Sequence, residues 1–285
     1  MQKWTRNYIL SIQVKDSQWI DISMPFTMSF RVVRNTFATA NTAKITILNL
    51  SEDTRRKIYK DRYKFDLYKG IELRAGYGMQ KELLPLIFKG NIKQAYSKKD
   101  KVDYITEIEA YDGGFAFQNG RTIRSFAAGT PDKQILKSLI EDLPAVSVGK
   151  IGTFKGSLPR GNAMQGVTAD LIKNVSNSNF FIDNEKAYCM QEEECFRGNI
   201  SEINSASGLL GSPQREETLL TFNMLFEPRL QVGQYVHLTS ETEKLFNGSY
   251  KVIGLEHSGT ISDATGGRCE SKVSLFYGAL PLRFI

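Results

Sequence analysis

The sequence predicts an α+β protein that is mainly β, with two β-rich sections on either side of a small α/β unit. Near both ends of the 285-residue chain, hydrophobic residues alternate with polar ones in short segments, as they do in half-buried strands. Only between about Thr130 and Asn179 do hydrophobic residues recur with a helical period. We therefore place the three units at residues 1–120, 121–199 and 200–285, and expect strands from elsewhere in the chain to complete the last one.

The first section is predicted to hold seven strands and one short helix. In its first strand Tyr8, Leu10, Ile12 and Val14 share one face. The helix begins at Ser51, whose hydroxyl can accept a hydrogen bond from a free amide of the first turn. The predicted strands are residues 6–14, 19–23, 26–33, 43–48, 71–76, 86–96 and 103–111, with a polar loop at 35–42 and a hairpin tip at 97–101.

The middle section is predicted to contain two amphipathic helices. For the first helix, Thr130 is the expected cap, Pro131 the first helical residue and Pro144 the stop. For the second helix, Asn162 and Gln165 have the spacing of a capping box. The residues expected on the buried sides are Ile135, Leu136, Leu139, Ile140 and Leu143 in the first helix, and Met164, Val167, Leu171, Ile172 and Val175 in the second.

A small hairpin is predicted to follow, with residues 180–182 and 187–190 as strands and Asp183-Asn184-Glu185 as the turn. The last section is again rich in strands. Its predicted strands are residues 218–226, 235–238, 250–255 and 272–277. The sequence shows no clear repeat between the two β-rich sections, so any duplication would be one of architecture alone.

Composition excludes several classes of protein. Hydrophobic residues make up 41% of the chain, which is enough for packed cores, but no segment approaches the roughly 18 to 20 apolar residues of a membrane helix. The first residues lack a secretion signal, so we expect the protein to fold and work from the cytosol. The odd number of cysteines (Cys189, Cys195 and Cys269) fits neither a zinc site nor a disulfide framework, and we expect no disulfide, metal or cofactor.

Residues that carry catalysis are scarce in this chain. The two histidines, His237 and His257, are expected to be partly exposed strand residues, and no nucleophile motif accompanies them. The run Glu192-Glu193-Glu194 could supply carboxylates to a glycosidase or a cation site. Consecutive residues in a turn do not have the geometry that either site requires, so we expect a solvated loop. The sequence therefore predicts that the protein is not an enzyme.

A basic hairpin is the strongest candidate for binding nucleic acid. Lys98, Lys99 and Lys101 lie near Tyr96 and Tyr104, so this surface could contact phosphates and stack bases. Lysines at a hairpin tip also keep the tip soluble and protect a sheet edge. The net charge of +6 is spread along the chain rather than clustered, and we favour the second interpretation.

The segment from Ser207 to Pro213 is a candidate interface. It places Leu209 and Leu210 between glycines in a predicted loop, where exposing both leucines to water would be unfavourable. We expect the leucines to dock, either on the core of their own chain or on a neighbouring molecule. The candidate interface residues are Ser207, Gly208, Leu209, Leu210, Gly211, Pro213, Pro228 and Gly233.

Several segments, in order along the chain, resemble one family. They are Trp4, Arg6, Tyr8 and Leu10; residues 43–51, 73–77 and 87–90; residues 207–213, 227–233 and 248–252; and His257-Ser258-Gly259. With these segments the sequence resembles the baseplate hubs of contractile-tailed phages, in particular those of Mu-like and related small myophages. The order and spacing of the segments carry the resemblance more than any one of them.

The resemblance implies a structural virion protein of the tail baseplate that is assembled in the host cytoplasm. In such a hub, each chain of a homotrimer supplies two tail-tube-like antiparallel β-barrel or sandwich domains. The resulting pseudo-sixfold ring joins the sixfold tail tube to a trimeric spike. The implied partners are further copies of the chain, the spike protein, the tube protein or a tube initiator, the tape-measure protein and baseplate wedge components.

DNA would pass through such a ring only as cargo. The channel wall is therefore expected not to be strongly basic, and the α/β unit is expected at the periphery. Three alternatives stay open. The protein could be the tail-tip hub of a flexible-tailed phage, which shares the same domains, or a DNA-binding virion protein that uses the basic hairpin. It could also be a tail-associated carbohydrate hydrolase, although the sequence shows no pair of carboxylates with the spacing that such an enzyme needs.

Overall fold

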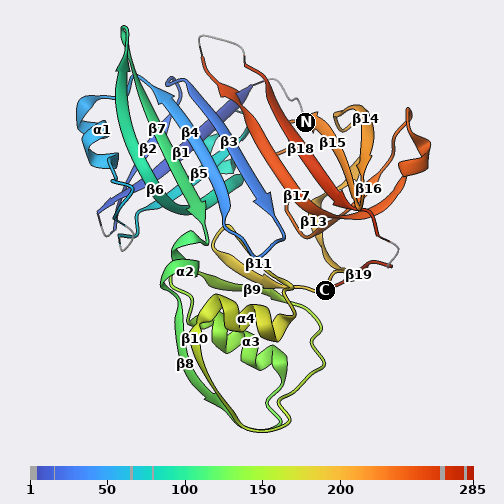
Figure 1. Ribbon diagram of the computed structural model, residues 1–285. Coiled ribbons are helices and arrows are strands. Elements are labelled where there is room, and N and C mark those ends of the chain that lie inside the picture. Colours follow the sequence, from blue (N-terminus) through green and yellow to red (C-terminus); the bar gives the residue numbers. More distant parts are fainter. Residues whose placement is uncertain (1–4, 16, 65–66, 79, 264–266, 279–280) are drawn as a thin grey trace.

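The chain forms three units, each with a hydrophobic core of its own (Figure 1). The computed structural model describes residues 5–15, 17–64, 67–78, 80–263, 267–278 and 281–285, so Trp4 lies outside the described residues. In Figure 1 two β units lie side by side and the α/β unit packs below them. The predominance of strands confirms the predicted fold class. None of the described helices combines the length and hydrophobicity needed to cross a membrane.

The first β unit is one curled antiparallel sheet with the order β3-β4-β7-β6-β5-β1-β2. Alternation places Tyr8 and Leu10 of β1 in the same core as Phe30 and Val32 of β3, so the two ends of the sheet pack together. Its strands are β1 (Arg6–Lys15), β2 (Gln18–Ser23), β3 (Met28–Asn35), β4 (Asn41–Leu48), β5 (Gly70–Tyr77), β6 (Leu86–Asp100) and β7 (Asp103–Asp112).

Two short helices belong to this unit. Helix α1 (Glu52–Ile58) begins as predicted, because the Ser51 hydroxyl accepts a hydrogen bond from the amide of Thr54. The 3-10 helix η1 (Lys81–Leu83) lies between β5 and β6.

The second β unit is again built of strands around a core of its own. Its strands are β13 (Glu194–Ile203), β14 (Leu209–Glu216), β15 (Leu219–Leu225), β16 (Gln234–Leu238), β17 (Gly248–Ile261) and β18 (Cys269–Phe276), with η2 (Lys244–Phe246) before β17 and the short β19 (Arg283–Phe284) paired with β13. The loop predicted for residues 207–213 is wrong from Leu209 onward, because these residues form β14 with β15 as partner.

The strand order of the first β unit recurs in the second. The order β3-β4-β7-β6-β5 has the counterpart β14-β15-β18-β17-β16, with the same connectivity and antiparallel pairing throughout. The longest strand of each unit, β6 or β17, carries a register shift at the same place, between Ile92 and Gln94 or between Val252 and Gly254. The two units are therefore duplicates in topology, although their sequences show no repeat.

The two β units share one continuous sheet. Strand β3 at the edge of the first unit pairs antiparallel with β17 of the second, from Met28 opposite Ile261 to Asn35 opposite Gly254. A bidentate ion pair between Arg31 and Glu256 adds to this contact. The backbone ladder thus fixes the orientation of one unit relative to the other.

The α/β unit packs two helices on a small sheet. Its elements are α2 (Gly114–Asn119), β8 (Arg121–Phe126), α3 (Asp132–Glu141), β9 (Ser147–Ile151), β10 (Asn162–Val167), α4 (Thr168–Ser176), β11 (Phe180–Asp183) and β12 (Lys186–Cys189). Strands β11, β12 and β9 form one sheet, and β8 pairs with β10 in a separate ribbon. The predicted hairpin at 180–190 is confirmed.

Two helix predictions in this unit need correction. The first helix is capped at Pro131 rather than Thr130, although its buried stripe is as predicted. The capping box at Asn162 and Gln165 is wrong, because these residues lie in β10 opposite Phe126 and Ile123. The second helix begins only at Thr168, since the backbone of residues 162–167 finds its hydrogen-bond partners in β8.

Candidate functional site at the junction of the three units

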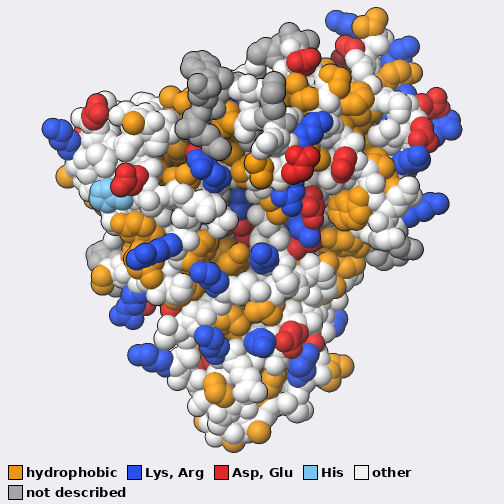
Figure 2. Space-filling view, turned by 180° about the vertical axis from the view of Figure 1, so that it is seen from behind, with side chains coloured by type: hydrophobic (Ala, Val, Ile, Leu, Met, Phe, Trp, Pro, Cys, Tyr) orange, Lys and Arg blue, Asp and Glu red, His pale blue; other side chains and the backbone are white. Residues whose placement is uncertain are grey.

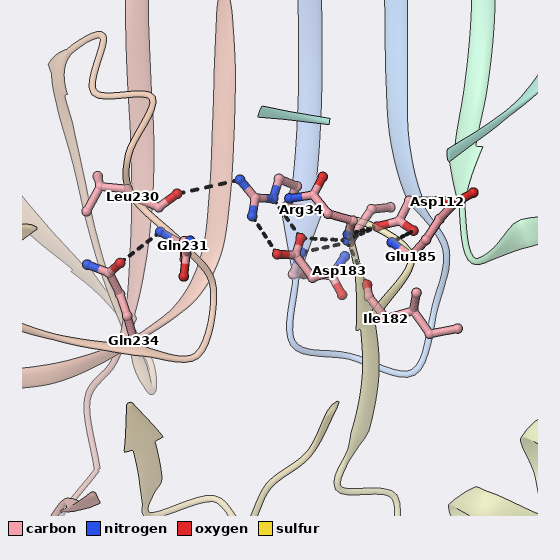
Figure 3. Close-up of polar contacts among 11 residues, drawn as sticks. Arg34, Asp112, Ile182, Asp183, Glu185, Leu230, Gln231 and Gln234 are labelled. Atoms are coloured by element: carbon pink, nitrogen blue, oxygen red, sulfur yellow. Dashed lines mark hydrogen bonds and ion pairs between the residues drawn. The ribbon is translucent and has the colours of Figure 1, made fainter. Parts of the chain in front are cut away.

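Arg34 connects all three units through one buried side chain (Figure 3). It follows Met28, Phe30 and Val32 on the inward face of β3, at the end of the strand where the first core stops. Its Nε and Nη2 donate to the two carboxylate oxygens of Asp183 at 2.7 and 2.5 Å. Its Nη1 donates to the carbonyl of Leu230 in the second β unit at 3.5 Å. Only 2% of the Arg34 side chain is exposed.

Asp112 holds the turn that carries Asp183. The turn residues Asn184 and Glu185 both have positive φ, 53° and 57°, as a two-residue hairpin loop between β11 and β12 requires. Their backbone N–H groups donate to the two side-chain oxygens of Asp112 at the end of β7, at 2.5 and 2.9 Å. The first β unit therefore stabilises a turn conformation that costs a non-glycine residue energy.

Two amides complete the hydrogen bonding of the junction. Asn41 donates to the carbonyl of Ile182 at 2.9 Å from the first β unit. On the other side, Gln234 accepts from the Gln231 amide at 3.0 Å and donates to the carbonyl of Ile200 at 2.7 Å, which fixes the loop that presents Leu230. Buried polar groups of this kind add to stability when they are paired. Asn41 is paired across a unit boundary, and Gln234 is paired within the second β unit.

The electrostatics of the junction are those of one balanced ion pair. Burial and the nearby Asp183 raise the pKa of Asp112 to about 8, so Asp112 is mostly protonated at neutral pH. Burial acts to lower the pKa of Arg34, but the neighbouring Asp183 outweighs it and the pKa is raised. Arg34 and Asp183 are then the charged partners, and their interaction is worth far more in this buried position than at the surface.

A cleft of about 910 Å³ opens next to the junction, where all three units meet. Glu185 lies at its wall, accepting a short hydrogen bond from Tyr68 and pairing with Lys89 at 3.5 Å. Arg74, Lys186 and Arg229 also line it, together with the carboxyl groups of Glu72 and Asp183. In Figure 2 basic and acidic side chains are intermixed in the middle of the molecular face, without a large patch of one sign.

The predicted catalytic candidates do not come together. His237 is exposed and faces Ser249, whereas His257 is fully buried and faces Ser271, so the expectation of two partly exposed histidines is wrong for His257. The expectation of a solvated acidic run is wrong for Glu194, which is buried and accepts from the amides of Thr153 and Gln191 at 2.7 and 2.9 Å. Among the described residues, no cluster of ligands could hold a metal ion.

The candidate interface residues divide into two groups. Gly208, Pro213, Pro228 and Gly233 are buried in the chain itself, whereas Ser207, Leu209 and Leu210 are half-buried and Gly211 is exposed. Leu209 packs partly against the second core. The β14 edge thus remains a predicted interface, centred on Leu209 and Leu210.

The basic hairpin carries less free positive charge than its sequence indicates. Lys98 pairs with Glu107 at 2.6 Å, and Lys93 lies 3.9 Å from Glu109 on the neighbouring strand. Lys99 lies over the ring of Tyr104. These partners leave little of the lysine row available for phosphate groups.

A family model described as baseplate hub gp41 matches residues 9–264 of the chain. The chain belongs to this family. Baseplate hubs are structural components of the phage tail, so the protein is a virion protein. The resemblance inferred from the segments above is therefore confirmed.

Solved structures show that the hub fold is shared widely. The chain matches the 43 kDa tail protein of prophage MuSo2 from Shewanella oneidensis with a TM-score of 0.60 at 9% identity, covering 95% of this chain and 98% of that one. It matches the tail protein from Neisseria meningitidis MC58 with a TM-score of 0.62 at 10% identity, over 98% and 99% of the two chains.

A secretion-system protein has the same fold. The E. coli c3393 protein, a type VI secretion component described as similar to the T4 tail proteins gp27 and gp5, matches with a TM-score of 0.60 at 9% identity, over 95% of this chain and 77% of that one. No curated protein matched the sequence. At these identities the solved structures establish the hub fold and nothing finer.

Proposed function

We propose that this baseplate hub forms a homotrimeric ring at the tip of a contractile tail and adapts the sixfold tail tube to a trimeric spike. The duplicated β topology carries the proposal. Two equivalent β units in each of three chains supply six similar surfaces, which is the number that a sixfold tube needs at a threefold junction. The α/β unit, which lies on one side of both β units in Figure 1, decorates the periphery of this ring.

We divide the hub along its three cores. Strand β13 runs across residue 199, where the sequence predicts the end of the α/β unit. Phe196 and Ile203, near the two ends of this strand, belong to the second core, so we assign the whole strand to the second β unit. Ala116 of α2 belongs to the core of the α/β unit. The Arg34 junction then acts as the clamp that holds the α/β unit rigidly on both β units while the ring carries load.

The proposed partners are the spike, the tube protein or its initiator, the tape-measure protein and the wedge components, with DNA passing through the ring. The lysines of the β6–β7 hairpin are paired with glutamates, which supports the proposal that DNA slides past this surface without being retained. The separation of His237 from His257 and the buried role of Glu194 support a hub without catalytic activity.

The mass of the purified protein tests the ring. Light scattering, on the hub alone and mixed with its spike protein, is expected to give a trimer of about 97 kDa, three times the chain mass of 32.2 kDa, or the corresponding complex with the spike. A protein that stays monomeric with and without the spike, and that retains DNA on a column in a salt-dependent manner, would instead favour a DNA-binding role for the hairpin.

A further inference from the structure

We propose that β14 of one hub copy pairs antiparallel with the outer half of β6 in the next copy, so that residues 209–216 lie against residues 96–101. This inference rests on the proposed ring and names the strands that close it. The occupant of each edge is a second copy of the same chain. The proposal follows from the duplicated topology and from the chemistry of the two edges.

The register of the sheet makes β6 and β17 equivalent residue by residue. Their register shifts match, so Ile92 corresponds to Val252 and Gln94 to Gly254. The pairing with the next strand supports the same alignment. Asn91 of β6 pairs with β5, and its counterpart Lys251 of β17 pairs with β16, the counterpart of β5. Residues 94–101 of β6 are thus the counterpart of residues 254–261 of β17.

The same reasoning makes β14 equivalent to β3. Leu209 lies opposite Met224 in β15, as Met28 lies opposite Ile47 in β4. Gln214 lies opposite Thr221 in β15, as Arg31 lies opposite Lys44 in β4. Between these two positions β14 has two more residues than β3, around residues 211–213. Within the chain, β3 pairs with residues 254–261 of β17. Its counterpart β14 and the counterpart segment of β6 should therefore meet in the equivalent contact, between two chains.

Both edges are open in the described chain. Strand β14 pairs with β15 alone, and its residues Gln214, Arg215 and Glu216 are exposed. On the side of β6 that faces away from β7, Lys60 bridges to Ala95, and no strand of the described residues pairs beyond that point. Figure 1 shows the two edges on opposite sides of the hub, so they can meet only between copies. Open edges of this kind are templates for strand addition.

The register predicts which residues face each other. By equivalence with the β3–β17 ladder, Tyr96 lies opposite Glu216, Ser97 opposite Arg215 and Lys98 opposite Gln214. Lys98 and Glu216 are then diagonal neighbours on one face, at a separation that long charged side chains can span. The half-buried Leu209 and Leu210 lie near the hairpin tip and become covered by the neighbouring copy.

Charge at the far end of the contact is complementary. A groove of about 470 Å³ runs beside the open edge of β6, lined by Arg55, Arg56 and Ser97 among others, and by Glu52, which pairs with Arg56 at 2.5 Å. In the proposed register the exposed Glu217 at the β14–β15 turn arrives at this groove, whereas the exposed Glu216 lies on the other face, near Lys98. Glu217 takes the place that Arg34 has in the contact within the chain, so an acidic turn meets a groove whose two arginines outnumber its one carboxylate.

Disulfide cross-linking tests the register. The variant Lys98→Cys with Gln214→Cys, mildly oxidised, is expected to give a covalent trimer near 97 kDa on a denaturing gel, because directly opposed strand residues lie within disulfide range. The matched control Lys98→Cys with Arg215→Cys is shifted by one residue, points to the other face and is expected to cross-link at least tenfold less. The native cysteines are buried in both variants.

The outcomes separate this inference from the ring itself. A trimer by light scattering under reducing conditions, without the disulfide trimer after oxidation, overturns the β14–β6 pairing and leaves the ring standing. A monomer with and without the spike that also fails to cross-link overturns both.

Charge reversal gives a second, independent measurement. Glu216→Lys with Glu217→Lys is expected to weaken the trimer at least tenfold in dissociation constant, because the change at Glu216 places a cation diagonal to Lys98 on one face and the change at Glu217 places one beside Arg55 and Arg56 on the other. Glu141→Lys with Asp170→Lys makes the same change of charge at exposed sites of the α/β unit and is expected to leave the trimer unchanged. Equal effects of the two variants would contradict the proposed docking of the acidic turn.

Discussion

Replacing Arg34 by methionine is expected to lower the free energy of unfolding by about 3 to 5 kcal/mol. The variant leaves the carboxylate of Asp183 buried without its cation, and it also removes a side chain that contacts all three units. Urea denaturation followed by circular dichroism measures the loss. The double variant Arg34→Met with Asp183→Leu is expected to recover part of it, because no unpaired charge remains in the interior.

Arg31 provides a matched control on the same strand. It forms a similar bidentate pair with Glu256, at 2.7 and 3.0 Å, but 60% of its side chain is exposed. Arg31→Met is therefore expected to cost less than about 1 kcal/mol. If Arg31→Met and Arg34→Met destabilise the hub equally, the junction does not depend on a buried ion pair.

The strands of the first β unit could be predicted because one face of each is buried. Alternation is strong wherever a strand covers a core, as in β1, β3 and β4, and the predicted limits there lie close to the observed ones. Strand β8 was missed because its exposed face carries Ile123, which breaks the expected alternation. The sequence predicts a helix over residues 162–167 because Met164 and Val167 have a spacing that a helix also allows, and only the pairing with β8 decides between helix and strand.

The junction was invisible in the sequence for a different reason. Arg34, Asp112 and Asp183 are far apart in the chain, and a charged residue near a strand end is usually solvated. One signal was available: Arg34 is in phase with Met28, Phe30 and Val32, which predicts an inward-facing arginine that needs a partner. His257 gives the same signal in β17, where it is in phase with the buried Leu255 and Ile261.

The duplication of the β units also could not be read from residue identities. Topology is preserved by hydrogen-bond pairing and by the burial of alternate residues, and neither requires the same side chains at equivalent positions. Thr42 and Leu219, for example, occupy equivalent places in the two ladders. The shared register shift in β6 and β17 became apparent only when the strand pairing was known.

Raising the pH from about 6.5 to 8 is expected to lower the free energy of unfolding by between about 1 and 2 kcal/mol, through Asp112. Burial holds the pKa of Asp112 at about 8 in the folded hub, against 3.8 ordinarily, so the folded state keeps a proton that the unfolded state has lost. This contribution to stability is complete below about pH 3.8 and is lost as the pH rises through 8. The raised pKa of Glu185, caused mainly by burial, acts in the same direction.

In the window from pH 6.5 to 8 two groups that act in the opposite direction contribute only part of their effect. Burial lowers the pKa of His257 to about 3, so its contribution rises with pH only up to about 6.5, where the unfolded histidine also becomes neutral. Burial lowers the pKa of Lys251 to about 8, and its contribution rises with pH only above that value. Between these limits the part of the decline that disappears in Asp112→Asn reports the ionisation of Asp112 at the turn it holds.

Asp112→Asn tests this assignment through the slope rather than the absolute stability. The amide has one acceptor oxygen where the carboxyl group has two, so the variant is expected to be less stable at pH 6.5 but nearly independent of pH up to 8. Asp142→Asn is the matched control, since the Arg124 hydrogen bond lowers the pKa of Asp142 and confines its titration to acidic pH. That control should keep the full decline of the natural hub. If the stability of Asp112→Asn still declines between pH 6.5 and 8, the titrating group is another buried residue, and Asp112 is ionised in the folded state.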